Sequence, residues 1–128
     1  METAKKDALK QKLESLDVTD FPRQLSKTKF AKMLGVTRKT LMEYHDIVNV
    51  VIPEFKQQYP IINDEVDTHY HLNQYQQWVL WKVIKTAMDT PRCYLRKQLI
   101  TDPRQKADLS YRAFSRELNQ SRRTVYAS

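Results

Sequence analysis

The stretch KFAKMLGVTRKTL, residues 29–41, decides the fold that we expect for this chain. Phe30 and Leu34 are one helical turn apart, so a helix here places both side chains on one face. Gly35, the only glycine of the chain, follows directly and can adopt the positive φ with which many helices end. Thr37 is a good N-cap for a second helix. The stretch therefore predicts two short helices that pack together across a tight turn.

This pattern resembles the helix-turn-helix family of DNA-binding proteins over residues 27–46. The family's own spacing is carried by Ala31, Gly35, Val36 and Leu41. The resemblance implies that the second helix enters the major groove and that its first residues read base edges. In this sequence those residues are Thr37, Arg38, Lys39 and Thr40. The residues expected to hold phosphates and set the register are Lys27, Lys29 and Lys32.

Positive charge is concentrated in two separate blocks of a chain whose formal net charge is +7. Residues 22–46 hold six basic and two acidic side chains, a net charge of +4, and residues 104–128 hold the same numbers. Residues 47–72 lie between them and carry a net charge of −3. Two basic blocks of equal charge favour two separate contacts with a polyanion, of which nucleic acid is the commonest.

The second basic block also repeats the sequence of the first. Residues 113–125 read AFSRELNQSRRTV and match residues 29–41 without a gap, at an offset of 84. The match predicts a second helix-turn-helix over residues 110–128, in which Asn119 replaces the glycine. Its expected DNA contacts are Arg112, Arg116, Ser121, Arg122, Arg123 and Thr124. Two alternatives stay open: chance similarity between two basic amphipathic helices, and a basic C-terminal helix that only docks.

Strands and one long helix are expected between the two basic blocks. The β-branched and aromatic residues that suggest short strands are Val50, Val51, Ile52, Ile61, Ile62 and Tyr70, with a turn at Asn63 and Asp64. Asn73 caps a helix over residues 74–88, which is apolar around most of its circumference and is therefore expected in the core, Trp78 and Trp81 included. An amphipathic helix is expected over residues 4–16.

The expected fold class is mainly α with a small antiparallel β component. Two helix-turn-helix units form an internal pseudo-dimer around a central long helix (residues 73–89) and short strands. The N-terminal half comprises residues 1–72 and the C-terminal half residues 73–128. We expect the two halves to form one compact unit because the chain has only 128 residues.

The order of these elements is similar to the MerR and excisionase group of winged helix-turn-helix regulators, over residues 28–87. The chain lacks that group's Gly-rich wing turn, which leaves Lys56, Gln57 and Gln58 as the wing contacts to expect. With a second head on the same chain, the sequence also resembles small DNA-binding proteins of conjugative type IV secretion systems in Gram-positive plasmids. The resemblance implies a cytoplasmic protein that binds double-stranded plasmid DNA as a regulator or accessory factor of transfer, with other conjugation proteins as further partners. Because both heads are on one chain, we expect a monomer that acts as an internal dimer.

Catalysis, a cofactor and a metal are not expected. His69, His71 and Cys93 are a weak metal signal because the chain has no second cysteine, and no glycine-rich loop is present to hold phosphates. A single cysteine fits a reducing cytosol, and no apolar run is long enough for a signal peptide or a membrane span. The alternatives to a duplex DNA binder are a basic adaptor for an acidic protein partner and an RNA or single-strand binder.

Overall fold

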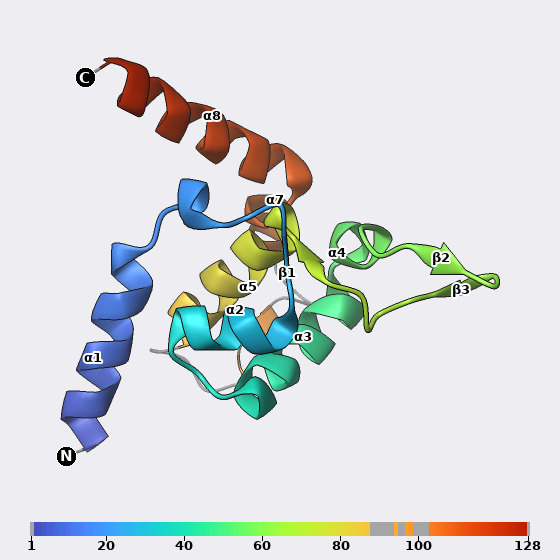
Figure 1. Cartoon of the computed structure of the whole chain (residues 1–128), viewed down its shortest axis with the longest axis horizontal. Helices are drawn as coiled ribbons and strands as arrows, with labels where there is room; N and C mark the ends of the chain where they lie inside the picture. Colours follow the sequence, from blue (N-terminus) through green and yellow to red (C-terminus); the bar gives the residue numbers. More distant parts are fainter. Residues whose placement is uncertain (1, 88–93, 95–96, 99–102, 128) are drawn as a thin grey trace.

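The computed structural model describes residues 2–87, 94, 97–98 and 103–127 (Figure 1). The elements follow in the order α1 (Glu2–Ser15), η1 (Val18–Asp20), β1 (Gln24–Leu25), α2 (Lys27–Leu34), α3 (Arg38–Val51), α4 (Pro53–Gln57), β2 (Ile61–Ile62), β3 (Glu65–Val66), β4 (Leu72–Asn73), α5 (Gln74–Ala87), α7 (Pro103–Asp108) and α8 (Tyr111–Ala127). The expected mainly α fold with a small antiparallel β component is confirmed.

Helix α5 forms the centre of the core, with α2 and α3 on one side and α8 on the other (Figure 1). Trp78 and Trp81 are both buried, as expected. The Trp78 indole N–H donates to the Glu117 carboxylate at 2.5 Å. The Trp81 indole donates to the Leu13 carbonyl at 2.7 Å and ties α1 to α5. Burying an apolar side chain of this size contributes about 1.5–3 kcal/mol, so α5 supplies much of the stability that holds the other helices in place.

The start of α5 is fixed by a reciprocal cap. The Asn73 side chain accepts from the Gln76 backbone N–H at 2.8 Å, and the Gln76 side chain accepts from the Asn73 backbone N–H at 2.9 Å. This capping box satisfies two N–H groups that a helix end otherwise leaves without partners. The predicted cap at Asn73 is therefore confirmed.

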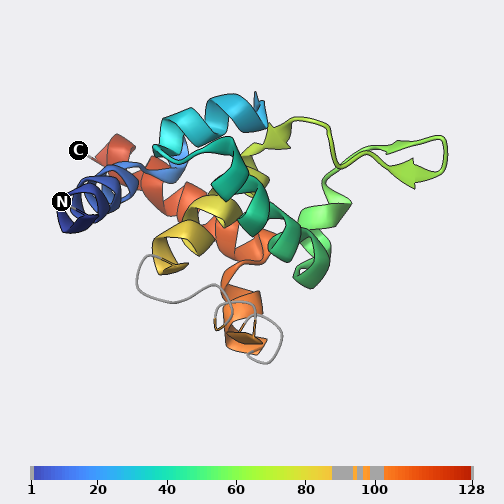
Figure 2. The ribbon, with the colours of Figure 1, turned by 90° about the horizontal axis from the view of Figure 1, so that it is seen from below.

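Two small antiparallel sheets complete the fold. Strand β1 pairs with β4, Leu25 opposite Leu72, and so closes the chain around the α2–α3 unit. Strands β2 and β3 form a hairpin whose turn residues, Asn63 and Asp64, have φ values of 54° and 64°. Asn and Asp tolerate this left-handed conformation better than other non-glycine residues, and two such residues match the twist of a hairpin. The predicted turn is confirmed, and the hairpin projects from the body of the molecule (Figures 1 and 2).

The strand predictions for Val50, Val51, Ile52 and Tyr70 are wrong. Val50 and Val51 form the last turn of α3, Ile52 is the residue that ends it, and Tyr70 lies in a turn. The helix continues because Val48 and Val51 follow the earlier buried positions at helical spacing, and this tertiary packing outweighs the β propensity of valine.

The prediction of a second helix-turn-helix over residues 110–128 is also wrong, and the internal pseudo-dimer that depends on it is not confirmed. Helix α8 runs unbroken through Asn119, Gln120 and Ser121, where the turn was expected. Asn119 is not among the described residues with positive φ. Asparagine can remain in a helix at lower cost than glycine, and the exposed Gln120 provides no apolar side chain to anchor a corner, as Val36 does in the first unit.

None of the helices in the described part of the chain has both the length and the apolar character required to cross a bilayer.

Candidate nucleic-acid interface

The turn between α2 and α3 is built on Gly35, which has a φ of 85°. The Gly35 N–H donates to the Lys32 carbonyl at 3.2 Å, and the Val36 N–H donates to the Ala31 carbonyl at 3.0 Å. These two bonds form a Schellman motif, which ends a helix and turns the chain sharply. Val36 then packs partly buried against the core. The predicted helix-turn-helix over the first basic block is present.

The second helix of the unit begins at a threonine cap. The Thr37 hydroxyl accepts from the Thr40 backbone N–H at 3.1 Å and donates to the Thr40 hydroxyl at 2.9 Å. Thr37 is therefore occupied in holding the first turn of α3. Thr40 keeps its own hydroxyl proton and can still donate it to an acceptor outside the protein.

Buried side chains fix the angle between the two helices. Helix α2 contributes Phe30 and Leu34, and α3 contributes Leu41 and Val48, all fully buried. Ala31 is also buried, and its small side chain lets the helices approach closely. Because the inner faces are fixed in this way, the outer side chains at the start of α3 are held on a rigid element.

Cations are exposed at the starts of both helices. Arg38 and Lys39 are exposed in the first turn of α3, Lys29 is exposed in the first turn of α2, and Lys32 is exposed one turn further on. The first turns of α2 and α3, both described in full, contain no carboxylate. A helix N-terminus carries a partial positive charge, so cations placed there are unfavourable until an anion approaches. The arrangement is therefore suited to binding anionic groups.

The prediction that Lys27 grips a phosphate is wrong. Its side chain is buried, and the ammonium donates to the carbonyls of Thr68 and, at 3.0 Å, Tyr70. It also lies 5.1 Å from the centre of the Tyr59 ring. Burial lowers the pKa of Lys27, and the nearby positive charge of Arg38 lowers it further. The lysine is used to hold the segment after the hairpin against α2.

A second buried polar cluster joins α3 to the base of the hairpin. The His45 Nδ1–H donates to the Asp46 carboxylate at 3.1 Å, which leaves Nε2 to accept from the Tyr59 hydroxyl at 2.6 Å. Burial lowers the pKa of His45 and raises that of Tyr59. Both rings also meet Phe55 edge to face. The cluster fixes α4 and the hairpin relative to α3.

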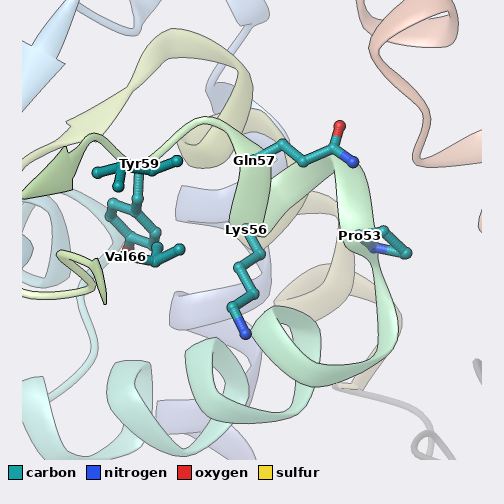
Figure 3. A pocket seen from close by; sticks show the side chains of 6 residues that line it. Pro53, Lys56, Gln57, Tyr59 and Val66 are labelled. Atoms are coloured by element: carbon teal, nitrogen blue, oxygen red, sulfur yellow. The ribbon is translucent and has the colours of Figure 1, made fainter. Parts of the chain in front are cut away.

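The hairpin stands where a wing would, but its charge has the wrong sign for contact with phosphates. Residues 61–67 carry three carboxylates and no basic side chain. Lys56, the predicted wing contact, lies on α4 beside this hairpin and is exposed at the rim of a shallow pocket (Figure 3). Gln57 also lines that pocket, and Gln58 instead bonds to Asn73.

The predicted contacts of the second basic block are not brought to the α2–α3 surface. Arg112 and Arg116 are exposed on α8, which lies on the opposite side of the molecule from the α2–α3 turn (Figure 1). Ser121 is half-buried, and its hydroxyl donates to the Asp17 carboxylate at 3.3 Å. The side chains of Arg122, Arg123 and Thr124 lie outside the described residues.

Lys12 is a cation beside the turn that the sequence did not single out. Its ammonium donates to the Lys32 carbonyl at 3.4 Å, and its side chain passes within 3.1 Å of the position that a Cβ would take on Gly35. The contact depends on how α1 packs against α2, and helical periodicity alone carries no signal for that packing. Lys12 extends the basic surface formed by Lys32 across the turn.

Among the described residues, no cluster of three His, Cys, Asp or Glu side chains has the arrangement of a metal site. Comparison of the chain with protein-family models, curated proteins and solved structures finds no match.

Proposed function

We propose that this protein binds double-stranded DNA through a single helix-turn-helix, with the start of α3 in the major groove. The observation that carries the proposal is the exposed pair Arg38 and Lys39 at the capped N-terminus of α3, in a unit whose first turns hold no carboxylate. An Arg guanidinium in that position can donate twice to guanine, and lysine can donate to the same acceptors.

The remaining cations of the unit would hold the backbone. Lys29 and Lys32 are exposed on α2, and Lys12 lies beside the turn. Contacts of this kind set position and contribute the salt-dependent part of affinity without reading sequence. Lys27 has no part in this proposal because its ammonium is buried and bonded within the protein.

The biological setting rests on resemblance alone. The sequence resembles TraN, the small DNA-binding protein of conjugative type IV secretion systems, and by that resemblance we propose a cytoplasmic regulator or accessory factor of plasmid transfer that also meets other conjugation proteins. One basis of that resemblance, the second helix-turn-helix, is not formed in α8.

A binding titration tests the proposed function directly. A fluorescent duplex of about 12 base pairs leaves room for one reading helix. We expect saturable binding that weakens as salt rises, and weaker binding to single-stranded DNA and to RNA of the same sequence. The variant Arg38→Ala/Lys39→Ala should lose most of the affinity. The matched control Arg112→Ala/Arg116→Ala removes the same charge from α8 and should change it little.

Three outcomes would overturn the proposal. Absence of duplex binding at moderate salt would favour an adaptor for an acidic protein. Preference for single-stranded DNA or RNA would favour that class of ligand instead. Equal losses in the two double variants would show that the start of α3 has no special place in binding.

A further inference from the structure

The hairpin of β2 and β3, residues 61–67, is a surface that the proposed DNA contact through α3 does not use. Ile61 is 71% exposed and Ile62 is 51% exposed, in a segment that also carries Asp64, Glu65 and Asp67. Within the described residues the hairpin pairs with no third strand. Phosphates would repel these carboxylates, whereas adjacent exposed isoleucines on a projecting element are typical of a contact with protein.

A patch of complementary character lies at the start of α8. Tyr111 is 47% exposed, and Arg112 and Arg116 are exposed four residues apart on one face of the helix. Neither arginine forms an ion pair within the described part of the chain. Because α8 lies on the opposite side of the molecule from the α2–α3 turn (Figure 1), these arginines are not needed at the proposed DNA surface.

The two patches border the same short helix. The Tyr111 backbone N–H donates to the Glu54 carboxylate of α4 at 2.6 Å, and the hairpin begins shortly after α4 ends. A pocket of about 290 Å³ lies between α4 and the hairpin (Figure 3). It is lined by Pro53, Lys56, Gln57, Tyr59, Ile61 and Val66. A two-fold axis close to α4 would place the hairpin of each copy against the start of α8 in the other copy.

We propose that the acidic hairpin is a self-association surface whose occupant is the start of α8 in a second copy of this chain. Ile62 of one copy, which is paired with Glu65 and shares its face of the hairpin, packs on Tyr111 of the other. Asp64 and Glu65 meet the arginines of that copy, with the same contacts repeated in reverse. Pairing of hairpin with hairpin is disfavoured because it brings like charges together. The oppositely charged α8 face is therefore the better occupant.

Self-association would supply a second reading head, of which the described part of one chain contains a single copy. Two copies present two α3 helices, and specific helix-turn-helix proteins commonly bind two half-sites as dimers. This consequence rests on the proposed function, whereas the association between copies requires no DNA. The two ideas can therefore fail separately.

Sedimentation equilibrium without DNA tests the association, at low salt and at protein concentrations up to about 0.5 mM, since a small interface of this kind is expected to be weak. We expect a concentration-dependent rise in mass from monomer to dimer. The variant Asp64→Asn/Glu65→Lys should loosen the dimer by about tenfold. Asparagine is used at residue 64 because that residue has a φ of 64°, which asparagine tolerates.

A charge exchange distinguishes direct contact from a general effect of charge. Arg112→Glu/Arg116→Glu should also loosen the dimer by about tenfold. Combining it with the hairpin variant should restore part of the loss, because the lysine introduced at residue 65 can pair with one of the two introduced glutamates. Lys29→Glu/Lys32→Glu reverses as many charges on exposed positions of α2 and should leave the mass unchanged.

A chain that stays monomeric over the whole range overturns the proposal, and so does a combined variant that associates no better than either reversal alone. The duplex titration is read independently, on a site with room for one head. Monomeric protein that still binds the duplex would refute self-association and leave the proposed function standing. Dimeric protein that does not bind the duplex would support self-association and refute the proposed function.

Discussion

The Lys27 ammonium lies 5.1 Å from the centre of the Tyr59 ring and donates to the Tyr70 carbonyl at 3.0 Å. The lysine at the start of α2 is thus turned inward, away from solvent. It joins α2 to the segment that leads from the hairpin back to β4. The charged group is retained in a buried position because carbonyl oxygens and an aromatic face replace the water that it loses.

Lys27→Met should therefore act on stability and not on DNA. The variant keeps the packed stem but removes hydrogen bonds from a charged donor, and we expect a loss of about 2 kcal/mol in the free energy of unfolding by urea. Lys29→Met, on an exposed position of the same helix, should change it by less than about 0.5 kcal/mol. A reduced salt slope for duplex binding in Lys27→Met would instead show that Lys27 reaches a phosphate.

Gly35→Ala should destabilise the protein by about 1–2 kcal/mol, because an L side chain in the left-handed conformation is strained. The added Cβ would also meet the Lys12 side chain at 3.1 Å, although that flexible chain can move aside. Thermal or urea unfolding measures the loss. Gly35→Asn is the matched variant and should lose less, because asparagine tolerates positive φ better than alanine. An alanine variant as stable as the parent would contradict the strained turn.

The first helix-turn-helix was predictable because its determinants are local. The two helices are fixed by the only glycine of the sequence, by a threonine cap and by apolar residues at helical spacing. None of these signals depends on a distant segment. The Asn73 cap and the turn at Asn63 and Asp64 were predictable for the same reason. Each depends on residues within four positions of one another.

The prediction drawn from the repeat at an offset of 84 is correct for the first helix of the second copy but wrong for the turn that should follow it. Ser26 caps α2 by accepting from the N–H three residues on, and Ser110 does the same for α8. Phe30 and Phe114 are buried at equivalent positions. The equivalence ends at Asn119, where the helix continues. Whether an asparagine ends a helix depends on what the next residues can pack against, and sequence similarity does not contain that information.

The role of Lys27 and that of Lys12 could not be predicted from sequence for a related reason. Both follow from contacts between segments far apart in the chain: Lys27 with residues near Tyr70, and Lys12 with the turn at Gly35. Basic residues close to the proposed reading helix look alike in a sequence, and only the packing of the helices separates the buried lysine from the exposed ones.

Acidification should weaken the fold through His45. Burial lowers its pKa below the ordinary value of 6.5, so the unfolded chain binds this proton more readily than the folded one. The stability that neutral His45 contributes is fully present above pH 6.5. It is lost as the pH falls from that value toward the pKa of His45 in the folded protein. A protonated ring would also donate from both nitrogens and could no longer accept from the Tyr59 hydroxyl.

Unfolding free energies measured between about pH 7 and pH 5 check this expectation. The parent should lose stability with a slope approaching, at most, about 1.4 kcal/mol per pH unit. His45→Gln should be less stable at neutral pH but should show a flatter dependence. His71→Gln, at an exposed histidine, should keep the parent's slope. Identical slopes in all three proteins would exclude His45 as the source.

Arg38 and Lys29 should affect DNA binding in different ways, because one lies at the start of the proposed reading helix and the other on the helix that would hold the backbone. Arg38→Ala should cost about 1–3 kcal/mol on a preferred site and little on other sequences, so that sequence preference flattens. Lys29→Ala should weaken binding to all duplexes alike and reduce the slope of log affinity against log salt by about 1. Titrations at several salt concentrations, on a selected site and on a shuffled duplex, measure both effects. If Arg38→Ala weakened both duplexes equally, Arg38 would be one more phosphate contact, and base reading would have to be assigned elsewhere on α3.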